Sequence, residues 1–87
     1  MEDEEILRRL VEIEGRDHVI DAVGGYSRRW NPLSNPADTF ALIEKYRPEM
    51  IPLSFRGDWQ VEVESDSMVC DESLPHAICL AIIEAHK

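Results

Sequence analysis

Apolar positions spaced three or four residues apart predict helices at the start, in the middle and at the end of the chain. Within residues 3–14 they share one helical face, behind acidic residues that suit a helix N-terminus: Ile6, Leu7, Leu10, Val11 and Ile13. Residues 16–23, RDHVIDAV, keep this spacing and predict a short second helical segment. That segment either extends the first helix through Gly15 or begins after it.

The middle helix has clear signals at both of its ends. Asn35 is a suitable N-cap, Pro36 suits the first helical position, and Pro48 disfavours helical geometry at the residue before it. The side chains expected to face the core are those of Phe40, Ala41, Ile43 and Tyr46. Residues 73–87 predict the last helix, which is apolar over so wide a face that we expect it at the centre of the core, across a sheet.

Between these helices the pattern changes to period two, which predicts strands. Apolar residues alternate with other residues in 51–56 and again in 59–64, and the Gly57–Asp58 pair between them is typical of a hairpin turn. Residues 67–71 predict a short third strand. The expected fold is therefore a single α+β domain over residues 1–87. It is a small αβα-type sandwich, in the order helix, helix, three-stranded antiparallel meander, helix.

Charge and composition limit the class of partner. The formal net charge is −9, from 9 basic and 18 acidic side chains. Direct binding to nucleic acid needs clustered Lys and Arg, so we do not expect it. No apolar run approaches the roughly 20 residues of a membrane span, so no membrane association is expected. Two cysteines are too few for a disulfide framework, and they favour a reducing cytoplasm.

The residues that could carry catalysis or bind metal have simpler structural explanations. The spacing of Cys70, His76, Cys79 and His86 does not match a common zinc pattern. No serine lies in a G-x-S-x-G motif. Paired strand carboxylates are more typical of a solvated sheet surface than of an acid/base pair. We therefore expect no cofactor, no metal and no enzymatic activity.

The loop between the second and third predicted helices contains the least explained residues: Tyr26, Arg28, Arg29, Trp30 and Asn31. Trp and Arg are enriched at interface hot spots, and arginine binds phosphate or carboxylate through two parallel hydrogen bonds. Two interpretations stay open. In the first, Trp30 covers the rim of the core while both arginines pair with nearby acids such as those at residues 2–5. In the second, the loop binds a protein, a second copy of the chain or a phosphorylated ligand.

A second candidate surface is acidic, and its residues are Asp58, Glu62, Glu64 and Asp66. If Trp59 and the alternate valines face the core, the carboxylates of the same strand face the other way. An uncovered acidic face would attract a basic protein through charge complementarity, and it could mimic the phosphates of DNA.

Four stretches make the chain resemble small proteins of tailed phages: EGRDHVIDAVGG, WNPLSNPADTFALIEKY, DWQVEVE and DESLPHAICLAIIEA. The last is the most specific, because five of its residues fall in register with the pattern of the NinX-like family and of related phage α-β-α sandwich proteins: Pro75, Ala77, Ile78, Cys79 and Ala81. The second stretch departs from the compact Ser-Thr-Asp turn of that family. The resemblance implies an αβα arrangement, a phage or prophage origin and a location in the host bacterial cytoplasm, and it implies no catalytic residues.

The expected function is that of a non-enzymatic phage or prophage accessory protein. It would bind a host or phage protein, and one role of this binding would be to counter a host defence system. Two alternatives are a sponge that sequesters a signalling nucleotide through Arg28 and Arg29, and an acidic inhibitor that mimics DNA. A homodimer is a further option.

Overall fold

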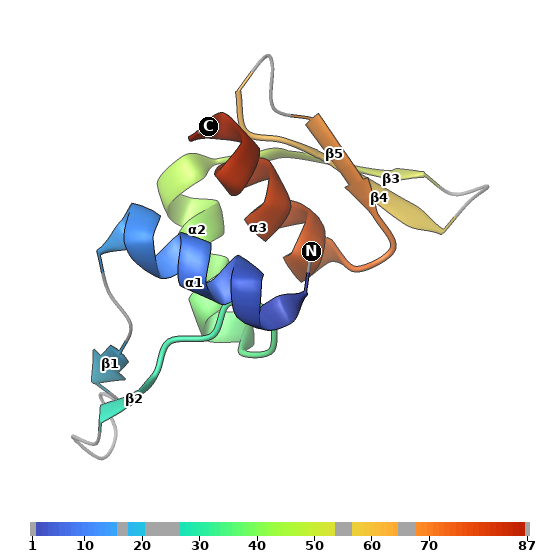
Figure 1. Cartoon of the computed structure of the whole chain (residues 1–87). Helices are drawn as coiled ribbons and strands as arrows, with labels where there is room; N and C mark the ends of the chain where they lie inside the picture. Colours follow the sequence, from blue (N-terminus) through green and yellow to red (C-terminus); the bar gives the residue numbers. More distant parts are fainter. Residues whose placement is uncertain (1, 16–17, 21–26, 54–56, 65–67, 87) are drawn as a thin grey trace.

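The computed structural model describes residues 2–15, 18–20, 27–53, 57–64 and 68–86 of the 87-residue chain. The elements of the fold, in chain order, are α1 (Asp3–Glu14), β1 (His18–Ile20), β2 (Ser27–Arg29), α2 (Pro36–Tyr46), β3 (Glu49–Leu53), β4 (Asp58–Glu62), β5 (Met68–Asp71) and α3 (Leu74–Ala85) (Figure 1). Three helices and a three-stranded antiparallel sheet confirm the small α+β fold expected from the sequence.

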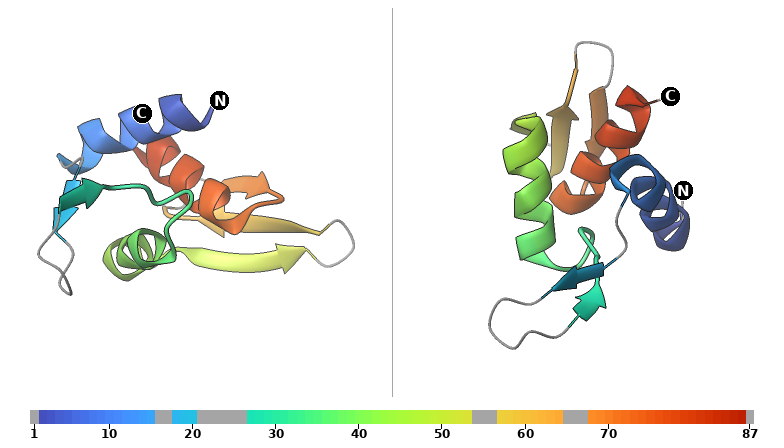
Figure 2. Two further views of the ribbon diagram at one scale, coloured as in Figure 1. Left: turned by 90° about the horizontal axis from the view of Figure 1, so that it is seen from below. Right: turned by 90° about the vertical axis from the view of Figure 1, so that its left-hand side faces the viewer.

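Helix α3 lies at the centre of the fold. It packs on β4 and β5 of the sheet, and it also contacts α1 and α2. In the view from below, α1, α3 and the sheet lie one above the other, with α2 to one side (Figure 2). Among the described elements α3 is the helix that contacts the sheet, so helices cover one face of the sheet and leave the other face without a helical layer.

The hydrophobic core gathers around α3, whose buried positions are Ala77, Ile78, Cys79, Ala81, Ile82 and Ile83. Ile6 and Leu10 of α1 pack against this helix, as do Leu42 of α2 and Val61 of β4. Such a wide apolar face can be buried only when other elements surround the helix on several sides. The expectation that the last helix is the core helix is therefore confirmed.

The sheet has the order β3-β4-β5, and its register fixes which side chains face α3. Met50, Val61 and Val69 are aligned across the three strands, and all three belong to the core or pack against it. Because side chains alternate along a strand, the neighbouring rows point to the uncovered face. The turn before β4 includes Gly57, whose φ of 72° lies in the left-handed region that glycine adopts at little cost.

The second helical segment predicted over residues 16–23 is wrong at residues 18–20, which form the strand β1, and its other residues lie outside the described part of the chain. Helix α1 ends at Gly15, which has a φ of 69° and donates its backbone N–H to the Val11 carbonyl at 2.8 Å. Strand β1 then pairs antiparallel with β2, with Val19 opposite Arg28. The β-branched residues Val19 and Ile20 suit a strand. This pairing with a distant strand was not visible in the local apolar spacing.

Helix α2 is confirmed with its Asn35 cap, which accepts a hydrogen bond from the Ala37 N–H at 3.0 Å. Its predicted inward face is confirmed for Ile43 and Tyr46, which pack against the core, and is wrong for Phe40 and Ala41. Phe40 is 59% exposed and Ala41 is also exposed, whereas Asp38 and Thr39 are buried. Asp38 and Thr39 are buried because they make hydrogen bonds there. The Thr39 hydroxyl donates to the Pro32 carbonyl, and the Asp38 carboxylate accepts hydrogen bonds from the preceding loop. These contacts rotate the helix so that polar side chains lie inside and Phe40 lies outside.

Candidate functional site

The structure supports the first of the two interpretations of Trp30, in which its side chain serves the core. Its side chain belongs to the core cluster and is 2% exposed, so a partner cannot use it as an aromatic contact. Asn31 is also occupied, because its Oδ1 accepts hydrogen bonds from the backbone N–H groups of Leu33 and Ser34 at 3.1 and 3.2 Å. Tyr26 lies outside the described residues. The loop residues after β2 therefore connect two elements and close the core.

Arg28 is paired with Asp38 of α2. The guanidinium donates to both carboxylate oxygens, at 2.7 and 2.8 Å, and the backbone N–H of Asn31 donates to the same carboxylate at 2.8 Å. The Asp38 side chain is 5% exposed and that of Arg28 is 31% exposed. This two-point ion pair attaches β2 to α2, and it occupies the arginine fork that a phosphate ligand would need.

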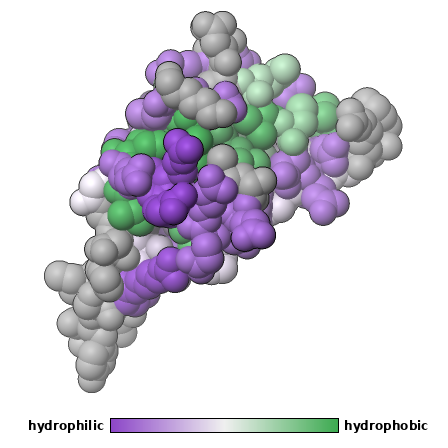
Figure 3. Space-filling model, viewed as in Figure 1, coloured by the Kyte–Doolittle hydropathy of each residue, from purple (hydrophilic) through white to green (hydrophobic). Residues whose placement is uncertain are grey.

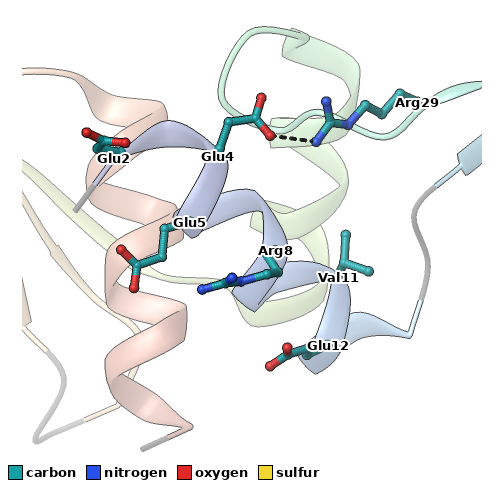
Figure 4. A pocket seen from close by; sticks show the side chains of 7 residues that line it. All are labelled: Glu2, Glu4, Glu5, Arg8, Val11, Glu12 and Arg29. Atoms are coloured by element: carbon teal, nitrogen blue, oxygen red, sulfur yellow. Dashed lines mark hydrogen bonds and ion pairs between the residues drawn. The ribbon is translucent and has the colours of Figure 1, made fainter.

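Arg29 points to a different neighbour, Glu4 of α1, with an N–O distance of 3.0 Å. Both side chains line a shallow charged hollow of about 730 Å³ along α1 (Figure 4), whose other lining residues are Glu2, Glu5, Arg8, Val11 and Glu12. Figure 3 shows hydrophilic surface over this helix. The hollow is lined by four carboxylates and two arginines, a mixture of charges that is typical of a solvated helix face. The interpretation in which Trp30 and the two arginines serve the fold is thus the one that the structure supports.

Two of the predicted acidic residues, Asp58 and Glu62, lie at the uncovered side of the sheet. Glu62 is aligned with Glu49 and Met68, and the next row contains Ile51, Gln60 and Cys70. Asp58 lies opposite Leu53, two residues further along the same face. We call this surface, formed by those two rows with Leu53 and Asp58, the outer sheet face. Glu64 is exposed just beyond β4, and Asp66 lies outside the described residues.

The outer sheet face is not purely acidic. Ile51 is 43% exposed and Met68 is 57% exposed, and both are large apolar side chains on this surface. At the end of the face where α2 leads into β3, a hollow of about 380 Å³ is lined by Arg47, Pro48, Glu49, Glu62, Val63 and Glu64. Its three carboxylates come from the start of β3, the end of β4 and the residues just after β4. The structure therefore places apolar and acidic side chains side by side.

A Ser–His–Asp arrangement that sequence reasoning missed joins α1 to the start of α3. His76 Nε2 lies 2.9 Å from Asp3 Oδ1, and His76 Nδ1 lies 3.0 Å from Ser73 Oγ. In a hydrolytic triad the carboxylate is buried, whereas the Asp3 side chain is 65% exposed. Neither Ser73 nor His76 lines any of the three hollows described for this molecule. The arrangement therefore acts as a contact between two helix N-termini.

The remaining candidate ligands are separated. Cys79 is buried in the core, and loss of solvation raises the pKa of its thiol to about 12, so it stays protonated. Cys70 is exposed on the outer sheet face, and His86 Nδ1 lies 2.8 Å from the Ile82 carbonyl oxygen. Within the part of the chain that the structure describes, no group of three or more His, Cys, Asp or Glu side chains could hold a metal ion.

A second cluster lies where α1 and α2 end. Lys45 donates to Glu14 Oε2, and the Glu14 side chain is 2% exposed. Its other oxygen, Oε1, is buried and has no hydrogen-bond partner among the described residues. The pKa of the Tyr46 hydroxyl is raised, mainly by its partial burial and to a smaller extent by the neighbouring Glu14 carboxylate. None of the three hollows described for this molecule is lined by Glu14 or Tyr46, and the Lys45–Glu14 ion pair joins the ends of the two helices.

Comparisons with known proteins do not extend this description. No protein-family model, no curated protein and no solved structure matches the chain. The resemblance to small tailed-phage proteins stays a prediction from the sequence. Among the described residues, no helix is long and apolar enough to cross a membrane.

Proposed function

We propose that the protein is a non-enzymatic binding module whose outer sheet face recognises a protein segment with an apolar centre and basic flanks. The observation that carries the proposal is the exposure of Ile51 and Met68, at 43% and 57%, on a sheet face that no described helix covers. Sheets with one face on the core normally present polar side chains on the other face. Large apolar side chains in that position favour a surface that a partner covers.

Charge supports a basic partner. Glu49 and Glu62 are directly opposite each other on adjacent antiparallel strands, and Glu64 lies beside them in the same hollow. Like charges in opposed positions destabilise a sheet by a few tenths of a kcal/mol to about 1 kcal/mol. Arg47 lines the same hollow, so three carboxylates there face one guanidinium, and a lysine or arginine brought by a partner would reduce the remaining excess of negative charge. The net charge of −9 would also steer a basic partner toward the molecule.

The two alternatives have less support. A nucleotide sponge based on Arg28 and Arg29 must break the ion pairs that these side chains make with Asp38 and Glu4. A DNA mimic presents repeated carboxylates, but Ile51, Gln60 and Cys70 form an uncharged row across this face. A role as a phage accessory protein that counters a host defence rests on the sequence resemblance alone.

The test uses synthetic peptides in which a Leu/Val centre is flanked by Lys and Arg, or by Glu and Asp. We expect the basic-flanked peptides to bind the wild type, measured by fluorescence anisotropy, and we expect added salt to weaken binding. The double variant Ile51→Ser, Met68→Ser should lose at least about tenfold in affinity, which corresponds to about 1.4 kcal/mol. Glu49→Gln combined with Glu62→Gln should lose the preference for basic flanks.

Two matched controls isolate the outer sheet face. Phe40→Ser removes an exposed apolar side chain elsewhere on the surface, and Glu12→Gln removes an exposed charge on α1. Both controls should bind as the wild type does. Equal binding of acidic-flanked and basic-flanked peptides, or full retention of binding by the Ile51→Ser, Met68→Ser variant, would refute the proposal.

A further inference from the structure

The two edges of the three-stranded sheet differ in how well they can accept another strand. The strand order is β3-β4-β5, so β3 and β5 each have one side without a neighbouring strand among the described residues. Strand β3 contains Pro52, which has no backbone N–H, and proline in an edge strand turns this donorless side outward. Strand β5 contains neither proline nor lysine, the residues that commonly protect an edge. The edge at β5 is therefore the one that can pair fully.

The register shows which backbone groups point to the free edge of β5. In antiparallel strands, hydrogen-bonded pairs alternate with pairs whose backbone groups point away from each other. Pro52 is aligned with Trp59 and has no N–H to exchange, so the backbone groups of Trp59 point to β5, where this residue is aligned with Asp71. Asp71 thus bonds to β4. Because the direction alternates along the strand, Met68 and Cys70 direct their N–H and C=O groups to the free edge.

From this geometry we infer that a partner segment binds as a fourth strand along β5, held by the backbone groups of Met68 and Cys70. The inference rests on the proposed function, and it adds how the segment with an apolar centre and basic flanks is held. Main-chain hydrogen bonds to a sheet edge supply affinity, and alternate side chains supply specificity. Met68 and Cys70 are exposed and belong to the outer sheet face, so alternate side chains of an added strand would lie beside theirs.

Charge determines the chemistry of the added strand. Glu62 lies opposite Met68 at one end of β5, and the exposed Glu72 follows β5 at its other end. A segment with Leu or Val beside Met68 would therefore bring lysine or arginine on either side close to a carboxylate. A second copy of the chain fits this edge poorly, because pairing two β5 strands in either direction brings their acidic ends together. Each molecule also carries a net charge of −9.

N-methylated versions of a basic-flanked Leu/Val peptide test the pairing in fluorescence anisotropy with the full-length wild type. In a paired strand, only alternate N–H groups face the neighbouring strand. One peptide is methylated on the N atoms of alternate central residues, and a second is methylated on the residues between them. We expect one of the two to lose at least about tenfold in affinity and the other to bind as the unmodified peptide does.

The substitution Cys70→Pro removes a donor from the protein side of the same pairing. The Cys70 N–H points away from β4, so the ladder between β4 and β5 keeps its hydrogen bonds, and edge strands tolerate proline. This variant should also lose at least about tenfold in affinity for the unmodified peptide. The matched control Cys70→Ser keeps the N–H and should bind as the wild type does. Circular dichroism checks that both variants are folded, and the methylated peptides decide the matter if Cys70→Pro is not.

The outcomes separate this inference from the proposed function. Equal affinities of the two methylated peptides, whether both bind or neither does, would overturn pairing at β5 while binding of the unmodified peptide still supports the outer sheet face. Wild-type affinity of folded Cys70→Pro would overturn it in the same way. If the unmodified peptide does not bind, the proposed function fails and the inference fails with it. Dimerisation of the free wild type that Cys70→Pro abolishes would assign the edge to a second copy and overturn the inference.

Discussion

Removing the Arg28 guanidinium tests whether the loop after β2 is held by the Asp38 carboxylate. In Arg28→Ala the two hydrogen bonds of 2.7 and 2.8 Å to Asp38 are lost, and a carboxylate that is 5% exposed loses its cation. Removing one partner of a buried ion pair costs about 3–5 kcal/mol. Because the Arg28 side chain is 31% exposed, solvent screens part of the interaction. We therefore expect a loss of about 2–3 kcal/mol.

This loss is large for a small domain. A chain of 87 residues is expected to be stable by about 4–13 kcal/mol, from roughly 0.05–0.15 kcal/mol per residue. Arg29→Ala is the matched control. It removes the neighbouring arginine, whose ion pair with Glu4 joins side chains that are 60% and 77% exposed. Exposed pairs contribute about 0–1 kcal/mol, so this variant should stay close to the wild type.

Urea unfolding followed by tryptophan fluorescence measures both variants. Trp30 is two residues from Arg28 and is 2% exposed, so its emission reports directly on this part of the core. A double-mutant cycle with Asp38→Ala should give a coupling energy of about 1–3 kcal/mol, as expected for residues in direct contact. If Arg28→Ala and Arg29→Ala cost the same, or if the coupling energy is near zero, Arg28 does not anchor the loop and the reasoning fails.

Four further results are expected. Lys45→Met should lower the free energy of unfolding by about 1–3 kcal/mol, and by more than Glu14→Gln does, because it removes the cation beside a carboxylate that is 2% exposed, whereas Glu14→Gln removes the carboxylate itself; equal costs in urea unfolding would contradict this. Thr39→Val should cost about 1 kcal/mol by the same assay, because its buried hydroxyl donates to a backbone carbonyl, and no loss would mean that the bond does not hold α2 in its rotation. A thiol reagent should modify the exposed Cys70 rapidly and the buried Cys79 only on unfolding, so two fast equivalents would contradict the packing of α3. Burial raises the pKa of the Cys79 thiol from 9.0 in the unfolded chain to about 12 in the folded protein, so its contribution to stability is fully present below pH 9 and is lost as pH rises toward 12, by up to about 4 kcal/mol. Cys79→Ala should reduce this alkaline loss of the free energy of unfolding, measured by urea unfolding at a series of pH values; the same pH dependence in the variant would show that Cys79 is not its source.

Local signals in the sequence determined the three observed helices, the Asn35 cap of α2 and the three-stranded sheet. Asn35 and Pro36 set the start of α2, Gly57 the turn before β4, and the wide apolar face after Ser73 the core helix. These features depend on backbone preferences and on burial periodicity, which act over a few residues and can be read from a single chain. For the same reason the alternation in 59–64 indicated correctly that Glu62 faces away from the core.

Only the tertiary structure decided the features that depend on contacts between distant residues. Residues 18–20 form a strand because β2 is available to pair with them, although their spacing also suits a helix. Phe40 lies outside because Asp38 is held inside by Arg28, and Trp30 lies inside, where the sequence had left open both a place at the core and a place in a binding loop. In each case a contact between residues that are distant in the sequence outweighs the local preference. For Asp38 the reason is that burying a polar group is favourable only where a partner of the right geometry is present.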